Sequence, residues 1–178
     1  MRVLDAGILT LEPQSAAHAP AMVCVLADPA IYAHENAPPE SVDALVERFT
    51  RLEARQSPNG QEAWLNWVVR LDTGELIGLV QSTVLSGGTA AIAYVLGSAW
   101  WGRGLASAAV RAMTDELVTR YAVTRLTAVI KQTNQRSLRL LQRMGFSRAP
   151  DSVHRAYGAE ADEVLRQKMV CGVHTSGF

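Results

Sequence analysis

The feature that most constrains this sequence is an apolar strand that runs through a short glycine-marked loop into a helix. The run Thr89–Leu96 is typical of a strand, and a helix with apolar residues at helical spacing begins after Gly104. Main-chain N–H groups at the start of a helix lack partners inside the helix, and the helix dipole adds partial positive charge there. Gly102 and Gly104 let this backbone come close to a bulky anion, and Arg103 adds a formal positive charge. The stretch therefore predicts a cradle for a pyrophosphate group.

Other nucleotide-binding loops fit the same stretch poorly. A dinucleotide-binding fingerprint needs a third glycine, and Ser107 stands where it belongs. That fingerprint also needs an acidic residue about 20 positions further on, and positions 120–123 offer none. The chain has neither a GxxxxGK[ST] loop nor a GxSxG elbow. These mismatches disfavour an NAD-type nucleotide binder.

Apolar spacing elsewhere in the chain predicts a mixed α/β fold. Residues recurring three and four apart predict helices over about Ala16–Leu26, after a Ser41 cap, after Gly104, and from an Asn134 or Thr133 cap to Gly145. Short β-branched or aromatic runs predict strands at Ile8–Glu12, Ala63–Leu71, Leu76–Leu85, Thr89–Leu96, Arg125–Ile130, Val153–Tyr157 and Val164–Cys171. Turns at residues 72–74 and 86–88 predict antiparallel hairpins, whereas the helix after Gly104 predicts parallel pairing of the two strands that flank it.

Composition narrows the class of protein without naming a function. The 178 residues include 17 basic and 17 acidic side chains, 6% aromatic residues and two cysteines. Balanced charge and few aromatics argue against a nucleic-acid partner, and no apolar run approaches the ~18 residues that a membrane span needs. Cys24 and Cys171 form no CxxC pair, which favours a reducing compartment. We expect one cytoplasmic domain over residues 1–178, with neither a nucleic-acid nor a membrane partner.

The histidines do not predict a metal site. The segment His34–Pro38 opens like a zinc HExxH motif, but Pro38 stands where the second histidine belongs. His18, His154 and His174 lack the spacing of metal ligands. No metal cofactor is therefore expected.

A second motif connects the glycine loop to a known family. Asn134-Gln135-Arg136-Ser137 opens a helix that ends in Gly145-Phe146, and the glycine loop itself reads Trp100-Trp101-Gly102-Arg103-Gly104. With the hairpin Gly74–Gly78, these motifs resemble the GNAT acyl-CoA N-acyltransferases, and within them the RimJ/RimL-like branch. The resemblance extends roughly from Thr10 to Val170.

The resemblance implies both a fold and a binding mode for acetyl-CoA. The fold is a splayed mixed sheet of about seven strands flanked by about four helices, with acetyl-CoA as cosubstrate in the split. The pantetheine arm is expected on the backbone of Tyr94, Val95 and Leu96, with Asn134 and Ser137 facing it and the sulfur. The pyrophosphate is expected beside Trp101, on Gly102, Arg103, Gly104, Leu105 and Ala106.

Amine acylation needs a base, an oxyanion donor and a proton for the leaving thiolate. Strand N–H groups near Val95 are candidates for the oxyanion donor. In many GNAT proteins a tyrosine seven residues after the asparagine protonates the thiolate, but Leu141 occupies that position. The branch often has a serine three residues after the asparagine, so Ser137 is the candidate for that role. The alternative for Ser137 is an ordinary residue of the first helical turn.

The general base is less defined by the sequence. The branch often carries a glutamate on the strand before the loop, but this chain reads Ala91-Ile92-Ala93-Tyr94 there. The remaining candidates are His34 and Glu35, and then His154 and Tyr157. An amine that arrives neutral would need no dedicated base.

The resemblance implies an N-acetyltransferase that acts on a primary amine, either a protein N-terminal α-amine or a small molecule. The missing glutamate and tyrosine favour an alternative, a catalytically weak acyl-CoA-binding module. We expect a monomer or a homodimer. Arg136, Arg139 and Arg143 are expected on a solvated helix face, with one of them able to reach the 3′-phosphate of CoA. Trp64 and Trp67 should face opposite sides of one strand, one in the core and one at the edge of the acceptor pocket.

Overall fold

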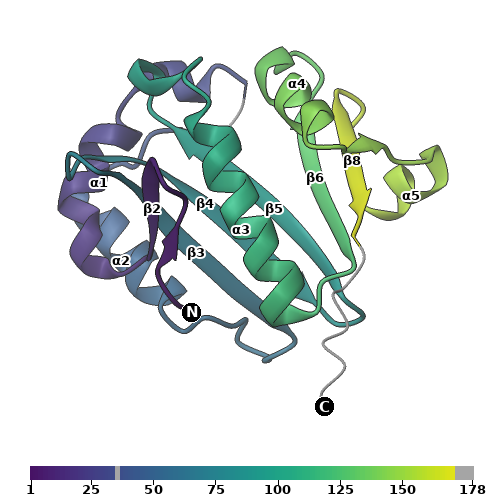
Figure 1. Cartoon of the computed structure of the whole chain (residues 1–178), viewed down its shortest axis with the longest axis horizontal. Helices are drawn as coiled ribbons and strands as arrows, with labels where there is room; N and C mark the ends of the chain where they lie inside the picture. The colour runs from purple at the N-terminus through teal and green to yellow at the C-terminus, as the bar shows by residue number, and fades with distance from the viewer. Residues whose placement is uncertain (35–36, 171–178) are drawn as a thin grey trace.

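The computed structural model describes residues 1–34 and 37–170, which form one sheet with helices on both faces (Figure 1). The strands are β1 (Leu4–Asp5), β2 (Leu9–Pro13), β3 (Glu62–Leu71), β4 (Leu76–Leu85), β5 (Thr89–Leu96), β6 (Arg125–Lys131), β7 (Ser147–Arg148) and β8 (Glu163–Met169). The helices are α1 (Ala19–Leu26), α2 (Val42–Leu52), α3 (Leu105–Tyr121), α4 (Gln135–Arg143) and α5 (Asp151–Ala156). Short 3₁₀ turns are η1 (Ala16–His18), η2 (Pro29–Tyr32) and η3 (Ser98–Trp100).

The sheet has eight strands in the order β1-β2-β3-β4-β5-β6-β8-β7. All neighbours are antiparallel except β5 and β6, which are parallel and joined by α3. The mixed sheet and its one parallel pair are as the turns and the connecting helix predicted.

The two faces of the sheet carry separate apolar cores. On one face, α3 packs Met113 and Leu117 against a layer that includes Trp67, and all three side chains are fully buried. On the other face, α1 and α2 bury Met22 and Phe49 against the sheet. Burial of each such side chain contributes about 1.5–3 kcal/mol. None of the helices in the described ranges is both long and apolar enough to cross a bilayer.

Local signals in the sequence correctly placed most elements. β4 and β5 have the predicted bounds, Ser41 Oγ caps α2 by accepting from Ala44 N, and the Asn134 side chain caps α4. Because the Asn134 side chain accepts from Ser137 N, Asn134, and not Thr133, is the cap of α4. The helix expected over residues 16–26 is divided into η1 and α1.

The predicted strand Val153–Tyr157 is wrong, because these residues belong to and follow α5. Pro150 precedes the helix, Asp151 lies in its first turn, and His154 and Arg155 lie in its last turn, as suits the helix dipole. These terminal signals outweigh the one β-branched residue, Val153. The two-residue strands β1 and β7 were not predicted, so the described chain has eight strands and five α-helices where about seven and four were expected.

Candidate active site

The split between β5 and β6 organises the candidate site. The two strands pair only where Thr89–Ala91 lies beside Arg125–Thr127, after which β5 stays with β4 and β6 stays with β8. Their carboxyl-terminal halves diverge, as the β5 and β6 arrows do in Figure 1. The splayed sheet implied by the resemblance is therefore present.

The free edge of β5 directs main-chain groups into this split. Leu96 lies opposite Gly78 of β4, and the next N–H, that of Gly97, donates to Ile77 O at 2.9 Å. Main-chain groups alternate between the two edges of an antiparallel strand. The N–H and C=O groups of Tyr94 and Leu96 therefore point away from β4, toward the split.

Gly78 lets β4 press against the end of β5. Relative to β3, β4 carries one extra residue at the step between Val69 and Arg70, which is a β-bulge. A Cβ on Gly78 would overlap Val95 O and lie 2.8 Å from Leu96 Cα. Any larger residue at this position would displace the end of β5.

The loop after β5 enters α3 through glycines with a left-handed backbone. The Trp101 indole N–H donates to Leu96 O at 2.8 Å, which folds the loop back over the end of the strand. Gly102 and Gly104 have φ angles of 78° and 79°, which strain any residue that has a Cβ. A Cβ on Gly104 would meet nothing within 4 Å, so open space lies in front of the first turn of α3. The N–H groups of that turn face this space without a capping side chain, as an anion cradle requires.

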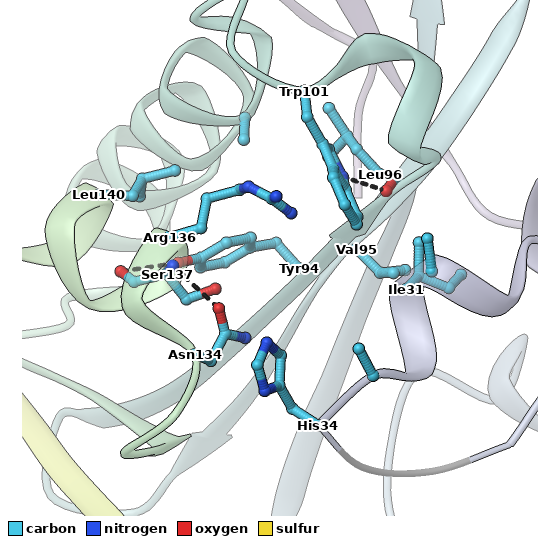
Figure 2. Close-up of a pocket in the computed structure, with 13 residues that line it drawn as sticks. Ile31, His34, Tyr94, Val95, Leu96, Trp101, Asn134, Arg136, Ser137 and Leu140 are labelled. Atoms are coloured by element: carbon cyan, nitrogen blue, oxygen red, sulfur yellow. Dashed lines mark hydrogen bonds between the residues drawn. The ribbon is translucent and has the colours of Figure 1, made fainter.

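Three arginines of α4 border the groove that opens from this loop. Arg136, Arg139 and Arg143 line it together with Trp101 and the first turn of α3. The Arg136 guanidinium lies over the Trp101 ring, with Cζ 3.5 Å from the ring centroid, in a cation–π contact (Figure 2). The arginine stripe is solvent-exposed, as predicted, and it also gives the groove a positively charged wall.

The first turn of α4 meets Tyr94 where this groove reaches the split. Asn134 Oδ1 accepts from Ser137 N at 3.1 Å, and the Tyr94 hydroxyl donates to Ser137 O at 3.4 Å (Figure 2). Burial raises the pKa of the Tyr94 phenol, so it carries its proton at neutral pH. Ser137 Oγ makes no hydrogen bond within residues 1–34 and 37–170, which leaves a second hydroxyl available at the same place.

The segment from Asp28 to His34 makes hydrogen bonds with both the loop after β5 and the start of α4. The Asp28 carboxylate accepts from Ser98 N at 2.7 Å and from Ala30 N at 2.9 Å, and hydrogen bonds from Ser98 lower the pKa of that carboxyl. At the other end, His34 Nδ1 lies 3.0 Å from Thr133 Oγ1. If Nδ1 donates in that bond, Nε2 is left as an acceptor, which is the form a base requires. Between these ends, Ala30 and Ile31 border a cavity beside Tyr94, which is also lined by Trp101 and Ser137 and is called the first cavity below.

A second cavity extends from the first across the α1–α2 face of the sheet. The residues that border both are Ile31, His34, Tyr94, Val95 and Asn134. The second cavity continues over Leu79, Gln81 and Ala93. Gln81 and Ala93 also border a third hollow, beside Trp64 and Asn66. Trp67 lies in the core and Trp64 lines this hollow, on opposite faces of β3 as the strand spacing predicted.

Comparison with known proteins decides the family. A family profile described as an acetyltransferase (GNAT) domain matches residues 9–147. The chain belongs to the GNAT family of acetyltransferases. No curated protein matches it by sequence.

Solved GNAT structures share the fold at low sequence identity. RimL, a ribosomal L7/L12 alpha-N-protein acetyltransferase in complex with coenzyme A, has a TM-score of 0.77 and 15% identity, over 94% of this chain and 98% of its own. Mycobacterium smegmatis RimJ, in complex with CoA-disulfide, has a TM-score of 0.75 and 24% identity, over 95% of this chain and 85% of its own. The aminoglycoside acetyltransferase AAC(6')-Ib, in complex with coenzyme A, has a TM-score of 0.70 and 21% identity, over 90% of this chain and 94% of its own. The resemblance to the RimJ/RimL-like branch is confirmed at the level of the fold.

In this GNAT fold, most residues predicted to hold acyl-CoA border the first cavity or the groove. They are Tyr94, Val95, Leu96, Trp101, Gly102, Gly104, Leu105, Ala106, Asn134 and Ser137. Arg103 lies exposed on the loop and does not border either hollow. The predicted oxyanion donor near Val95 is refined by the strand alternation, which turns the N–H groups of Tyr94 and Leu96 to the split.

The candidate bases separate into three groups. His34 borders both the first and the second cavity. Glu35 lies outside the described residues. His154 bonds Glu163 O through Nε2 at 3.0 Å, and the Tyr157 hydroxyl lies 2.8 Å from Thr127 Oγ1, so both hold α5 to the β6–β8 part of the sheet. Neither His154 nor Tyr157 borders the cavities described above.

In the described ranges, no group of three His, Cys, Asp or Glu side chains is placed so that it could hold a metal ion.

Leu141 has no access to the groove, because its side chain is fully buried in the core beneath α3 and α4. The functional candidates that sequence reasoning missed are side chains: the Tyr94 hydroxyl, and the Asn66 and Gln81 amides. Tyr94 was predicted only for its backbone, and period-two alternation along β5 would have directed its side chain to α4. Asn66 interrupts an apolar strand, which was the available signal for a polar patch on that face.

Proposed function

We propose that this chain is an acetyl-CoA-dependent N-acetyltransferase that moves an acetyl group to a primary amine by direct attack on the thioester. The observation that carries the proposal is the junction at Tyr94 and Val95. There the first cavity, which shares Leu96, Trp101 and Arg136 with the arginine-lined groove, meets the second cavity, with which it shares Tyr94 and Val95. A donor and an acceptor that filled the two hollows would meet at this junction.

Acetyl-CoA fits the chemistry of the groove. Its pyrophosphate would accept from the N–H groups at Gly104–Ala106, and its remaining phosphate would lie near the α4 arginines, with Arg136 held over Trp101. Its pantetheine amides would pair with the N–H and C=O of Tyr94 and with the N–H of Leu96, since Leu96 O already accepts from the Trp101 indole. Coenzyme A in the RimL, RimJ and AAC(6')-Ib structures supports the same choice of donor.

The reaction forms a C–N bond and breaks a C–S bond. The attacking amine must lose a proton, because an ammonium has no lone pair, and His34 is the candidate to accept that proton. Main-chain N–H groups of β5 that point into the split would stabilise the oxyanion. The departing thiolate would take a proton from the Ser137 hydroxyl or from a water that Ser137 holds. The Tyr94 hydroxyl lies next to Ser137 O.

The acceptor is a protein N-terminal α-amine or a small-molecule amine. RimL, an alpha-N-protein acetyltransferase, supports the first class, and the aminoglycoside enzyme supports the second. A catalytically weak acyl-CoA-binding module is the second candidate function. It is favoured because Leu141 replaces the tyrosine that the resemblance implied, and residues 91–94 lack the glutamate that it implied. One domain over residues 1–178, a cytoplasmic location and a monomer or homodimer stay predictions.

The test combines binding with turnover. Calorimetry should detect acetyl-CoA binding and no NAD binding, and thiol release from acetyl-CoA should rise with at least one member of an amine panel. Binding without thiol release from any amine would favour the binding module. Binding of NAD without binding of acetyl-CoA would contradict the whole proposal.

A further inference from the structure

The sheet face under α2 changes from apolar to polar at one step along β3, β4 and β5. The register places Val68, Leu79 and Val95 in one row across the three strands. The α1–α2 layer covers this row. The next row on the same face is Asn66, Gln81 and Ala93, and the row after it is Trp64, Thr83 and Ala91. The residues of these two rows line the third hollow, which is also bordered by Leu52 of α2.

The two amides in the middle row are already oriented by each other. Gln81 Nε2 donates to Asn66 Oδ1 at 2.9 Å. Asn66 is only 4% exposed, so its position is fixed by its surroundings. Its Nδ2 and the Gln81 Oε1 make no hydrogen bond with the described residues, which leaves a donor and an acceptor side by side. A peptide unit offers the complementary C=O and N–H.

The row lies at a useful distance from the reacting junction. Val95 and Ala93 are two residues apart on β5, which is about 7 Å along a strand. That is about the length of two residues of an extended chain, and Gln81 and Ala93 border both the second cavity and the third hollow. An acceptor with its amine at Val95 would thus bring its first peptide units over the Asn66–Gln81 pair.

No charged side chain is among the described residues that border the third hollow, and the nearby Glu62 carboxylate is occupied by the Trp64 indole N–H at 2.9 Å. Its border consists of Leu52, Trp64, Asn66, Gln81, Ser82, Thr83, Ala91, Ile92 and Ala93. An ammonium group placed directly over the Asn66–Gln81 pair would lose water and gain only the Gln81 Oε1 acceptor, which is costly. A neutral amide would instead pair both its C=O and its N–H with the two side chains.

We propose that Asn66 and Gln81 form an acceptor subsite that recognises a neutral peptide unit, and that it selects an extended peptide N-terminus over compact amines. The inference rests on the proposed function for the position of the amine. It concerns acceptor binding, so it can be tested apart from turnover.

The test measures binding of Ala-Ala-Ala amide and of n-butylamine to the CoA-saturated protein by calorimetry. The wild-type protein should bind the tripeptide at least tenfold more tightly. Asn66→Asp removes both Nδ2 protons while keeping the acceptor for Gln81, so it should weaken the tripeptide about tenfold and leave butylamine within about twofold. Gln81→Met should act in the same direction through loss of Oε1. Asn59→Asp, the same change on an exposed turn, is the matched control and should alter nothing.

CoA affinity in each variant reports whether the site is intact. An unchanged tripeptide affinity in both variants, or a wild-type protein without preference for the tripeptide, would overturn the subsite. Absence of thiol release from wild-type protein would instead count against the acetyltransferase proposal. If Asn66→Asp fails to bind CoA, the Gln81→Met result decides the matter.

Discussion

The proposed donor side and the proposed acceptor side of the site are built from different kinds of groups. The donor side consists of main-chain groups at the end of β5 and the start of α3, with a wall of arginines from one helix. The acceptor side consists of side chains from the Asp28–His34 segment, α2 and three strands. A backbone cradle recognises a group common to all its ligands, whereas a surface of scattered side chains can differ freely between relatives. We therefore expect changes on the donor side to affect binding of acyl-CoA, and changes on the acceptor side to affect choice and rate.

Gly104→Glu gives the largest expected effect. Acetyl-CoA binding should weaken at least ~100-fold, because a left-handed backbone strains the new residue and its carboxylate faces the pyrophosphate. Calorimetry measures the loss. Gly87→Glu is the matched control, since Gly87 also has positive φ and open space around it but lies on the β4–β5 hairpin. Equal losses in both variants would show that strain, and not the cradle, is responsible.

Ser137→Ala separates catalysis from binding at the point where the two sides meet. The turnover number should fall about 30-fold, within the range of lost general acid catalysis, while the acetyl-CoA dissociation constant changes less than about threefold. Steady-state kinetics and calorimetry measure the two quantities. Ser152→Ala, on the exposed face of α5, should leave both unchanged. Full turnover in Ser137→Ala would remove this hydroxyl from the mechanism.

His34→Gln tests the acceptor side through pH. Glutamine can still bond Thr133 but cannot take a proton, so kcat/KM should fall about tenfold at pH 7. The deficit should shrink as pH rises, because more of the amine is already neutral. Rate profiles from pH 6 to 10 measure this, with His154→Gln as control. A deficit that stays constant across the range would mean that His34 only positions its neighbours.

Arg136→Ala gives the smallest expected effect. Its guanidinium is exposed, so acetyl-CoA affinity should fall about threefold at low salt and less at high salt. Calorimetry at two ionic strengths measures it, and Arg148→Ala on β7 serves as control. An effect that does not depend on salt would indicate that Arg136 acts by supporting the Trp101 ring alone.

The same contrast explains what could be predicted from the sequence. Gly102, Gly104, Asn134 and Ser137 were identifiable because each acts through a local motif, a turn or a cap, within a few residues of its element. The Asn66–Gln81 pair was not, because these residues lie 15 positions apart in the chain and are brought together only by the register of β3 and β4. The strand predicted at Val153–Tyr157 failed for a different reason, because local helix-end signals at Pro150 and Asp151 outweighed its β-branched and aromatic residues.

The first and second cavities meet at Tyr94 and Val95, and beyond that junction they are bordered by different elements, the first by α3 and α4 and the second by α2 and β4. Each reactant would thus have its own entrance, and neither would need to leave before the other arrived. Initial-velocity plots with acetyl-CoA and an amine as the varied substrates should accordingly intersect instead of running parallel, the signature of a ternary complex with no acylated protein along the way.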